Sequence, residues 1–324
     1  MVLSSGLPLR DLERFGPQNC GSLDGSSLGC ALSIKEACEY TKSLTQKHYE
    51  NFSTVSWLIP AKLRQDFCNI YAYCRWADDL ADETTGAASC ETSPVWEPEA
   101  LLDWWEGLLH EMYRPNSTPT HPVFRALKET TERWSIPPAP FEDLLSAFRQ
   151  DQKVKNYDTR DQLLDYCSRS ANPVGRLVLY LANTTDEEAF RLSDSICTGL
   201  QLANFWQDVA RDWHERSRIY IPAEDRERFG YSEVDFRNET QNENFFALMK
   251  EEVDWAESFF TRGKPLLKRL RGRFRMQVRL FHDGGVSVLD AIRKCRCRVW
   301  VQRPVVSKWR KLALILRAAL SGGF

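Results

Sequence analysis

The sequence contains no run of apolar residues long enough to cross a membrane, although 43% of its 324 residues are hydrophobic. A transmembrane helix needs about 20 consecutive apolar residues. The N-terminus also lacks the basic start and apolar run of a secretory signal peptide. We therefore expect a protein that is neither exported by that route nor embedded in a membrane, and that has enough apolar residues to build a folded core.

Cysteine pairs with the spacing of a metal or redox site are also missing. The ten cysteines are scattered without a CxxC, and several lie in apolar helical patterns, where a reduced cysteine acts as a small hydrophobic residue. Cys295 and Cys297 are close together, but no second Cys or His pair accompanies them, so a zinc site is not expected. This usage favours a reducing compartment and predicts a cytoplasmic location.

Strand patterns are nearly absent, and turn-rich stretches separate segments with helical periodicity. Residues 1–32 are rich in Gly, Ser and Pro and are predicted to form a loosely ordered lead-in. No repeat and no linker follow residue 33, so we predict one all-α domain over residues 33–300. Its helices are expected at Ile34–Tyr49, Ala61–Glu83, Glu99–Met112, Val123–Trp134, Phe141–Lys155, Thr159–Ser170, Pro173–Ala182, Glu187–Asp212, Asn244–Leu270 and Met276–Cys297.

Charge is unevenly distributed along the chain, although the net charge is only −2. The stretch Arg262–Arg317 contains 17 Lys and Arg against Asp283 and Asp290, a pattern that indicates either an anionic partner or a solvated helix surface. No nucleic-acid motif accompanies it, so nucleic acid is not the expected partner. Residues 301–324 are predicted to form a basic amphipathic helix around Trp309, which either contacts an anionic membrane surface or docks on the core.

Four carboxylates crowd into the apolar stretch ADDLADE, residues 77–83. On a helix Asp78 and Asp82 share one face a turn apart, and Asp79 and Glu83 form a second pair rotated by about 100°. Like charges at this spacing repel by a few tenths of a kcal/mol, so the helix gains nothing from the arrangement. We expect Asp78 and Asp82 to be ligands of a cation, with Asp79 and Glu83 as supporting charge.

A second acidic row makes the first interpretable. Asn204, Asp208 and Asp212 repeat at i, i+4 and i+8, and Gln201 extends the row by one turn. Carboxylate and amide oxygens on two helices form a hard, oxygen-rich site of the kind that suits Mg²⁺, which keeps positions open for substrate phosphates. A di-iron site is disfavoured because no histidine lies in either row.

A metal-bridged diphosphate between helices suggests ionisation chemistry. Mg²⁺ neutralises a leaving diphosphate and helps to break a carbon–oxygen bond, which gives a carbocation. Arg75 and either Arg216 or Arg218 are the basic side chains expected to bind the same diphosphate. Aromatic walls around Phe52, Tyr71 and Tyr166 would stabilise the cation and exclude water. By themselves, tyrosines in such positions are more often core residues than catalytic ones.

The two rows resemble the aspartate-rich signatures of the squalene/phytoene synthase family. The likeness rests on Tyr71-Ala-Tyr-Cys-Arg75-Trp-Ala-Asp78-Asp-Leu-Ala-Asp82 and on Gln201-Leu-Ala-Asn204-Phe-Trp-Gln-Asp208-Val-Ala-Arg-Asp212, and it extends over about residues 37–292. It implies an all-helical isoprenoid synthase fold around a central cavity, Mg²⁺ at both acidic helices, and ionisation of prenyl diphosphates.

Three stretches are similar to the bacterial hydroxysqualene synthases of this family rather than to its condensing members. They are His48-Tyr-Glu-Asn-Phe52, Ser168-Arg-Ser-Ala-Asn-Pro-Val-Gly175 and Asn204-Phe-Trp-Gln-Asp208. That branch implies presqualene diphosphate as substrate and water capture of the cation to give hydroxysqualene, with Asn172 as a candidate for holding the water. Head-to-head condensation of two prenyl diphosphates and a non-catalytic lipid-binding role remain the alternatives.

The resemblance assigns roles to individual residues. It implies catalytic roles for Tyr71, Arg75, Tyr166 and Asn172. Substrate contacts are expected from His48, Phe52, Arg75, Val174, Gly175, Gln201, Asn204 and Arg218, and metal contacts from Asp78, Asp82, Asn204, Asp208 and Asp212. His48 could equally be a hydrogen-bonded residue at a helix end, and Gly175 could simply permit close helix packing. The implied partners are the prenyl diphosphate, a peripheral membrane contact and neighbouring enzymes of the squalene pathway.

Overall fold

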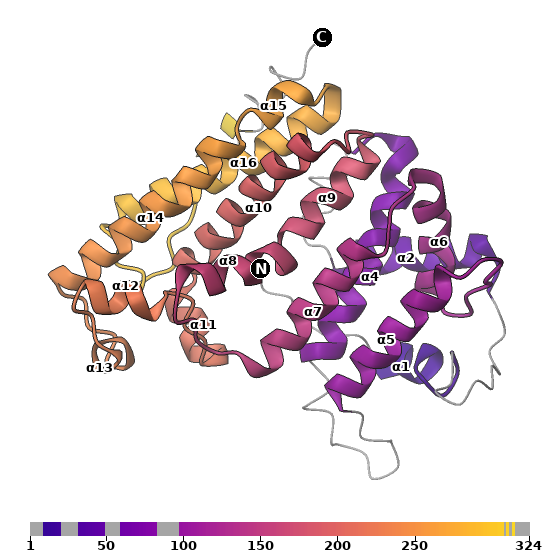
Figure 1. Ribbon diagram of the computed structural model, residues 1–324, viewed down its shortest axis with the longest axis horizontal. Coiled ribbons are helices and arrows are strands. Elements are labelled where there is room, and N and C mark those ends of the chain that lie inside the picture. The colour runs from indigo at the N-terminus through magenta and orange to yellow at the C-terminus, as the bar shows by residue number, and fades with distance from the viewer. Residues whose placement is uncertain are drawn as a thin grey trace. The chain divides into compact units, whose positions relative to one another are not determined.

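A computed structural model describes residues 9–20, 32–48, 59–82, 97–307, 309–310 and 313–314 (Figure 1). Side chains are described from residue 11, and those of His48 and Asp82 lie outside the description. Within these ranges the regular structure is helical, and a single isolated bridge pairs Asn156 with Ile219. The all-α prediction is therefore confirmed. None of the described helices combines the length and apolarity that crossing a bilayer requires.

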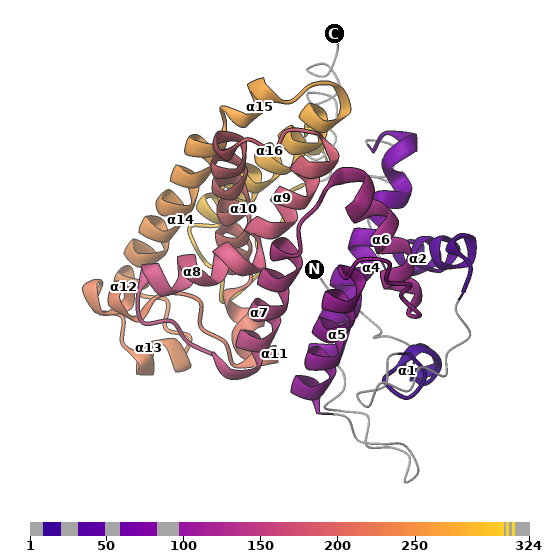
Figure 2. The same cartoon turned by 45° about the vertical axis from the view of Figure 1, so that its right-hand side comes forward.

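The chain divides into two compact units, Met1–Gln152 and Lys153–Phe324. In the first unit α2 packs on α4 and α6, and α4 also packs on α5. Its elements are α1 (Leu9–Phe15), α2 (Ile34–His48), η1 (Ala61–Leu63), α4 (Arg64–Asp82), α5 (Pro98–Met112), α6 (Pro122–Trp134) and α7 (Ala139–Lys153), the last of which ends at the boundary (Figure 2).

An aromatic cluster forms the core of the first unit and fixes the helix that carries the first acidic row. Trp76 on α4 stacks on Trp105 of α5 with ring centroids 5.3 Å apart. The His121 ring stands edge-on to both indoles, at 4.8 and 4.9 Å. His121 Nδ1 accepts a hydrogen bond from the Val123 backbone N–H and so caps α6. Burial lowers the pKa of His121 to about 3, so this histidine is neutral.

The second unit is built around α10, which packs on α9, α14 and α16. Asp186 caps α10 by accepting from the Ala189 N–H, and the acidic first turn suits the helix dipole. The elements are α8 (Arg160–Ser170), α9 (Asn172–Leu181), α10 (Glu187–Gln207), α11 (Val209–Arg216), α12 (Ala223–Arg228), α13 (Glu233–Arg237), α14 (Glu243–Gly263), α15 (Leu266–Arg269) and α16 (Gly272–Lys294) (Figure 1).

Close helix packing explains one glycine on α9 and one on α16. A Cβ on Gly175 of α9 would lie 2.5 Å from Cys197 Sγ and from Ser193 Oγ. A Cβ on Gly285 of α16 would lie 2.3 Å from the Phe260 ring. Real Cβ atoms do not approach other atoms this closely, so both helices need glycine to reach their neighbours.

The structure differs from the predicted helices in several places. The lead-in contains α1, which is too short to show a periodic pattern but buries Phe15 and hydrogen-bonds Tyr40 through Asp11. The predicted helix Glu187–Asp212 breaks at Asp208, and Asn244–Leu270 breaks before Pro265, which cannot continue a helix. The short helices α12 and α13 were not predicted, although Ser232 and Asp235 form a capping box.

Candidate active site

The first acidic row lies near the end of α4 and contains a buried ion pair. Arg75 Nε donates to Asp79 Oδ2 at 2.9 Å, and a second guanidinium nitrogen contacts Asp79 Oδ1. Arg75 and Asp79 are each 3% exposed. Asp78 lies 3.8 Å from Arg75 Nη1, and its side chain is 31% exposed. The two neighbouring carboxylates therefore have different environments.

This geometry assigns distinct tasks to the residues of α4. Asp79 balances the charge of Arg75 and fixes its guanidinium. Asp78 is the carboxylate of this pair that remains accessible to a cation or to a phosphate-bound metal. Tyr71, one turn before Arg75, is half-buried on the same helix.

The second acidic row begins on α10 and continues past a break in the helix. Gln201 and Asn204 are half-buried on α10. Asp208 has φ −107° and ψ 18°, so it separates α10 from α11, but the hydrogen bonds Asp208 N–H to Asn204 O and Asp212 N–H to Asp208 O continue across the break. The predicted spacing of four residues is thus retained, with a bend at its central aspartate.

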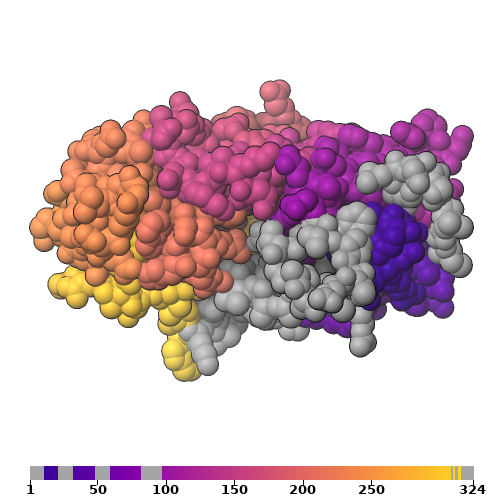
Figure 3. Space-filling model, turned by 90° about the horizontal axis from the view of Figure 1, so that it is seen from below, coloured from indigo at the N-terminus to yellow at the C-terminus, as the bar shows by residue number. Residues whose placement is uncertain are grey.

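Asp208 is bound by an arginine that the sequence did not single out. Arg303 Nε donates to Asp208 Oδ1, and its Nη2 donates to Oδ2 at 3.0 Å and to Gln207 Oε1 at 3.2 Å. Asp208 is 3% exposed. The hydrogen bond from Arg303 to Asp208 raises the pKa of the guanidinium. Arg303 lies in the segment after α16, whose yellow atoms run along the orange surface of this unit in Figure 3.

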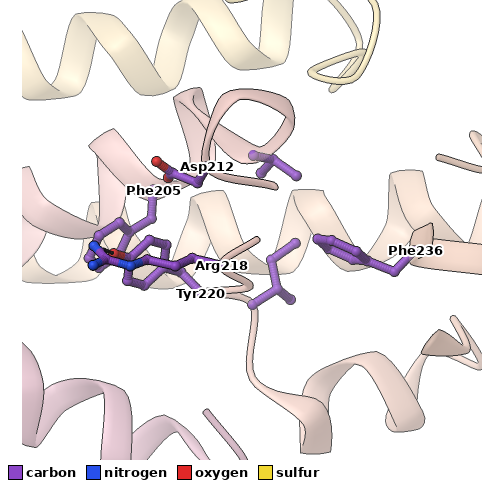
Figure 4. A pocket seen from close by; sticks show the side chains of 7 residues that line it. Phe205, Asp212, Arg218, Tyr220 and Phe236 are labelled. Carbon is purple, nitrogen blue, oxygen red and sulfur yellow. Dashed lines mark hydrogen bonds between the residues drawn. The ribbon is translucent and has the colours of Figure 1, made fainter. Parts of the chain in front are cut away.

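Asp212 and Arg218 line a small cavity with aromatic walls (Figure 4). Asp212 Oδ2 is buried, and among the described residues no group donates a hydrogen bond to it. Burial, and then the charge of Asp208, raise the pKa of Asp212 to about 7. The ionised Asp212 carboxylate would be stabilised by an added positive charge, because the groups around it do not offset burial and the charge of Asp208.

The loop after α11 brings Arg218 to this cavity. Ser217 adopts a left-handed conformation at φ 51°, and the Arg218 N–H then donates to the Asp212 carbonyl at 3.0 Å. Ile219 N–H donates to Lys155 O, which anchors the loop. Arg218 is 5% exposed, whereas Arg216 is exposed. Of the two arginines left open by the sequence, the structure places Arg218 beside Asp212.

Stacked aromatic rings form one wall of the same region. Phe205 and Tyr220 stack with ring centroids 3.7 Å apart. Tyr166, 3% exposed, lies within 6.3 Å of both rings. Arg218 Nη1 donates to Tyr220 Oη at 3.3 Å, and Figure 4 shows the side chains of Phe205, Arg218 and Tyr220 together. Tyr220 and Phe205 were not predicted as site residues, because their spacing along the chain is also that of ordinary core residues.

The predicted residues at the start of α9 divide into three environments. Asn172 is 7% exposed, and its Oδ1 accepts from Thr198 Oγ1 at 3.0 Å. Among the described residues, its amide nitrogen has no hydrogen-bond partner. Val174 is 47% exposed. Gly175 packs on α10, where a Cβ would meet Cys197 and Ser193. Phe52 lies outside the described residues, as do the side chains of His48 and Asp82.

Comparison with known proteins identifies the family. The sequence profile of squalene/phytoene synthases matches residues 45–310. The chain belongs to the squalene/phytoene synthase family. A hydroxysqualene synthase from Sinorhizobium fredii is 31% identical over 254 residues, 77% of this chain and 82% of that protein. A 15-cis-phytoene synthase from Synechocystis sp. is 30% identical over 299 residues, 89% and 85% of the two chains.

Solved structures confirm the fold. The crystal structure of squalene synthase HpnC from Alicyclobacillus acidocaldarius has a TM-score of 0.75 and 39% identity, and the match covers 81% of this chain and 95% of that one. A dehydrosqualene synthase has the same TM-score at 24% identity and supports the fold alone. The protein is thus an enzyme of the squalene/phytoene synthase family with an all-helical isoprenoid synthase fold, and the family implies prenyl diphosphate substrates.

The described residues of this synthase fit the Mg²⁺ that the family typically uses. No cluster of three or more His, Cys, Asp or Glu side chains occurs among them. Mg²⁺ does not require one, because it keeps several waters and binds through one or two carboxylates plus substrate phosphates. The buried, unpartnered Asp212 Oδ2 and the neighbouring Asp208 carboxylate, now held by Arg303, are donors of that kind.

Proposed function

We propose that this synthase converts presqualene diphosphate and water to hydroxysqualene and diphosphate, as a carbon–oxygen lyase of squalene and hopanoid biosynthesis. The hydroxysqualene synthase relative supports this choice, together with the stretch that contains Asn172. Asn172 carries the proposal, because it is buried, oriented by Thr198, and keeps its amide nitrogen available. Such a group can hold a water molecule beside a carbocation without being a strong base.

The proposed metal-binding residues are Asp78, Asp82, Asn204, Asp208 and Asp212. When bound there, Mg²⁺ supplies the positive charge that makes diphosphate a good leaving group. Arg218, positioned beside Asp212, is suited to hold the departing phosphate oxygens through charge-assisted hydrogen bonds. Arg75, fixed by Asp79, is proposed for the same task. Tyr71 and Tyr166 are proposed to face the cation.

The remaining predicted residues are proposed to bind the substrate. Gln201 continues the polar row on α10, and Val174 exposes an apolar side chain at the start of α9, which suits a prenyl chain. His48, Phe52 and Gly175 complete the proposed set. The enzyme is proposed to act in the cytoplasm and to meet the membrane peripherally, where its C30 substrate and product reside.

A substrate test decides between this reaction and condensation. The phytoene synthase relatives, one at 30% identity over 89% of the chain, favour head-to-head condensation as the second candidate. Purified protein with Mg²⁺ is incubated separately with farnesyl, geranylgeranyl and presqualene diphosphate. Consumption of presqualene diphosphate alone, with hydroxysqualene as product, supports the proposal, whereas turnover of farnesyl or geranylgeranyl diphosphate alone supports condensation.

Three variants test the site. Asn172→Ala should lower the yield of hydroxysqualene relative to other products, because water is no longer held, and Thr198→Val should do so more weakly. An unchanged product ratio in Asn172→Ala would refute the role of Asn172. Asp208→Ala should abolish diphosphate release. Release that persists would refute the metal assignment, and no turnover of any of the three substrates by the wild-type chain would favour a non-catalytic lipid-binding protein.

A further inference from the structure

The corner where α14 ends, α15 lies and α16 begins is strongly basic. Residues 258–282 contain eight Lys and Arg and no Asp or Glu. The corner is found beside the α15 label in Figures 1 and 2. Six of these basic residues are exposed, and we call them the basic corner: Arg262, Lys264, Lys268, Arg269, Arg271 and Arg273.

Half of the six residues in the basic corner are not engaged inside the protein. Arg269 pairs with Asp186 at 2.8 Å, and Arg262 lies over the Phe259 ring at 3.9 Å. Within the described part of the chain, Lys264, Lys268 and Arg271 have no ion-pair partner. Exposed lysines without partners contribute little to stability and repel one another, so folding alone does not account for the cluster.

A cleft joins Lys264 of the basic corner to Arg310 and Leu314, which follow α16 in the chain. Lys264 and Arg310 line the same cleft, which has apolar walls from Phe260, Val286 and Leu314. Arg310 is held there by Ser287, to which its Nε donates at 3.2 Å. The adjacent Trp309 is 81% exposed. A large aromatic side chain therefore projects into solvent next to the cationic groups.

Acidic residues near the cleft are already paired and do not cancel this charge. Glu257 is bound by Arg293 at 2.5 Å. Asp283 contacts His282 at 2.9 Å and Arg279 at 3.6 Å. Arg310 lies 3.6 Å from Asp290, so Lys264 is the lining cation of this cleft that has no ion-pair partner among the described residues.

We propose that the basic corner and Trp309 form a docking face for the surface of a membrane rich in anionic phospholipid. Unpaired lysines and arginines complement anionic headgroups, and each contributes about fivefold to binding near such a surface. An exposed tryptophan suits the boundary between headgroups and acyl chains. Nucleic acid would use the cations but offers no apolar layer for Trp309, so the membrane is the better match.

This face gives the enzyme a place to collect its substrate. The proposed use of the face in collecting substrate rests on the proposed function, since prenyl diphosphates with long chains partition into membranes. The binding of vesicles does not depend on the proposed function. None of its residues belongs to the proposed catalytic or metal-binding sets. Binding and turnover can therefore fail separately.

Vesicle binding by the full-length chain tests the proposal. Phosphatidylcholine vesicles with and without phosphatidylglycerol are sedimented with wild-type protein and with Lys264→Ala/Lys268→Ala/Arg271→Ala. The triple variant should bind the anionic vesicles roughly 100-fold more weakly, because three contributions of about fivefold are lost. The control Lys62→Ala/Arg114→Ala/Lys250→Ala removes the same charge from exposed positions elsewhere and should change binding by less than about threefold.

Further measurements separate the contribution of charge from that of Trp309, and the docking face from the active site. Trp309→Ala should reduce the binding that survives high salt, because salt screens only the charges. Turnover of detergent-solubilised presqualene diphosphate should be unchanged in the triple variant. Equal losses of vesicle binding in the two triple variants, or wild-type vesicle binding in both, would overturn the docking face. The docking face would also be overturned if Lys264→Ala/Lys268→Ala/Arg271→Ala lost RNA binding but kept its vesicle binding. Lack of turnover in the wild-type chain would instead count against the proposed function.

Discussion

The ion pair between Arg303 and Asp208 predicts how the second acidic row responds to a divalent cation. The Arg303 guanidinium and a bound cation require the same Asp208 carboxylate, so in the absence of metal the guanidinium supplies the positive charge. Replacing Arg303 by methionine keeps most of the side-chain stem and removes the charge. We expect Arg303→Met to be less stable than the wild type without metal, and to gain more from Mg²⁺.

The structure sets the size of the effect. Removing one partner of a fully buried pair costs about 3–5 kcal/mol, and an exposed pair contributes at most about 1 kcal/mol. Asp208 is 3% exposed, whereas the Arg303 side chain is 44% exposed, so we expect about 2 kcal/mol. This corresponds to a fall in Tm of roughly 4–8 °C. Relief from the competing guanidinium should tighten Mg²⁺ binding by up to about 30-fold.

Calorimetric melting in EDTA and across a Mg²⁺ titration, without substrate, measures both quantities. The matched control is Arg310→Met, on the same segment. Arg310 lies 3.6 Å from Asp290 with both side chains largely exposed, so its loss should cost less than about 1 kcal/mol and leave the Mg²⁺ midpoint unchanged. If Arg303→Met melts like the wild type in EDTA, or titrates at the same Mg²⁺ concentration, the competition argument is wrong.

Three further predictions concern buried groups. His121, with its pKa lowered to about 3 by burial, stays neutral in the fold, so stability is lost as pH falls from about 6.5 towards 3, by up to about 4–5 kcal/mol. The free energy of unfolding of His121→Asn, measured with urea at each pH, should fall much less over the same pH range. Burial and then Asp225 raise the pKa of Glu252 to about 8, so stability falls as pH rises from about 4.5 to 8; Glu252→Gln should raise Tm at pH 8 but not at pH 4.5. Gly175→Ala should cost about 1–3 kcal/mol by overpacking, and adding Cys197→Ala should restore part of the loss in denaturant melts.

The sequence predicted most helices because their apolar periodicity is long and regular. The breaks were not visible in that signal. The bend at Asp208 leaves the i, i+4 hydrogen bonds in place, so the periodicity of neighbouring apolar residues hardly changes across it. The helix α1 is only seven residues long, and it is held by Phe15 and Asp11 through tertiary contacts that no local pattern shows.

Both acidic rows could be predicted from spacing, but only one of the two arginines that bind their carboxylates could be. Arg75 was found because it lies one turn before Asp78 on the same helix. Arg303 is 95 residues from Asp208 in the sequence and lies among many other basic residues, so only the folded chain identifies it. Arg218 was one of two alternatives, and the left-handed Ser217 decides which of them turns inward.

Each acidic row, considered within its own unit, combines a carboxylate that an arginine binds closely with a second one that is less fully neutralised. Arg75 balances Asp79 and leaves Asp78 partly exposed. Arg303 balances Asp208 and leaves Asp212 with a buried oxygen that no described group satisfies. Like charges at i, i+4 would otherwise repel, so one arginine per row makes the crowding tolerable without removing all the negative charge. The residual charge is what a cation and a diphosphate would use, and because Arg303 can leave Asp208 while Arg75 is fully buried, the second row is the one expected to change when metal binds.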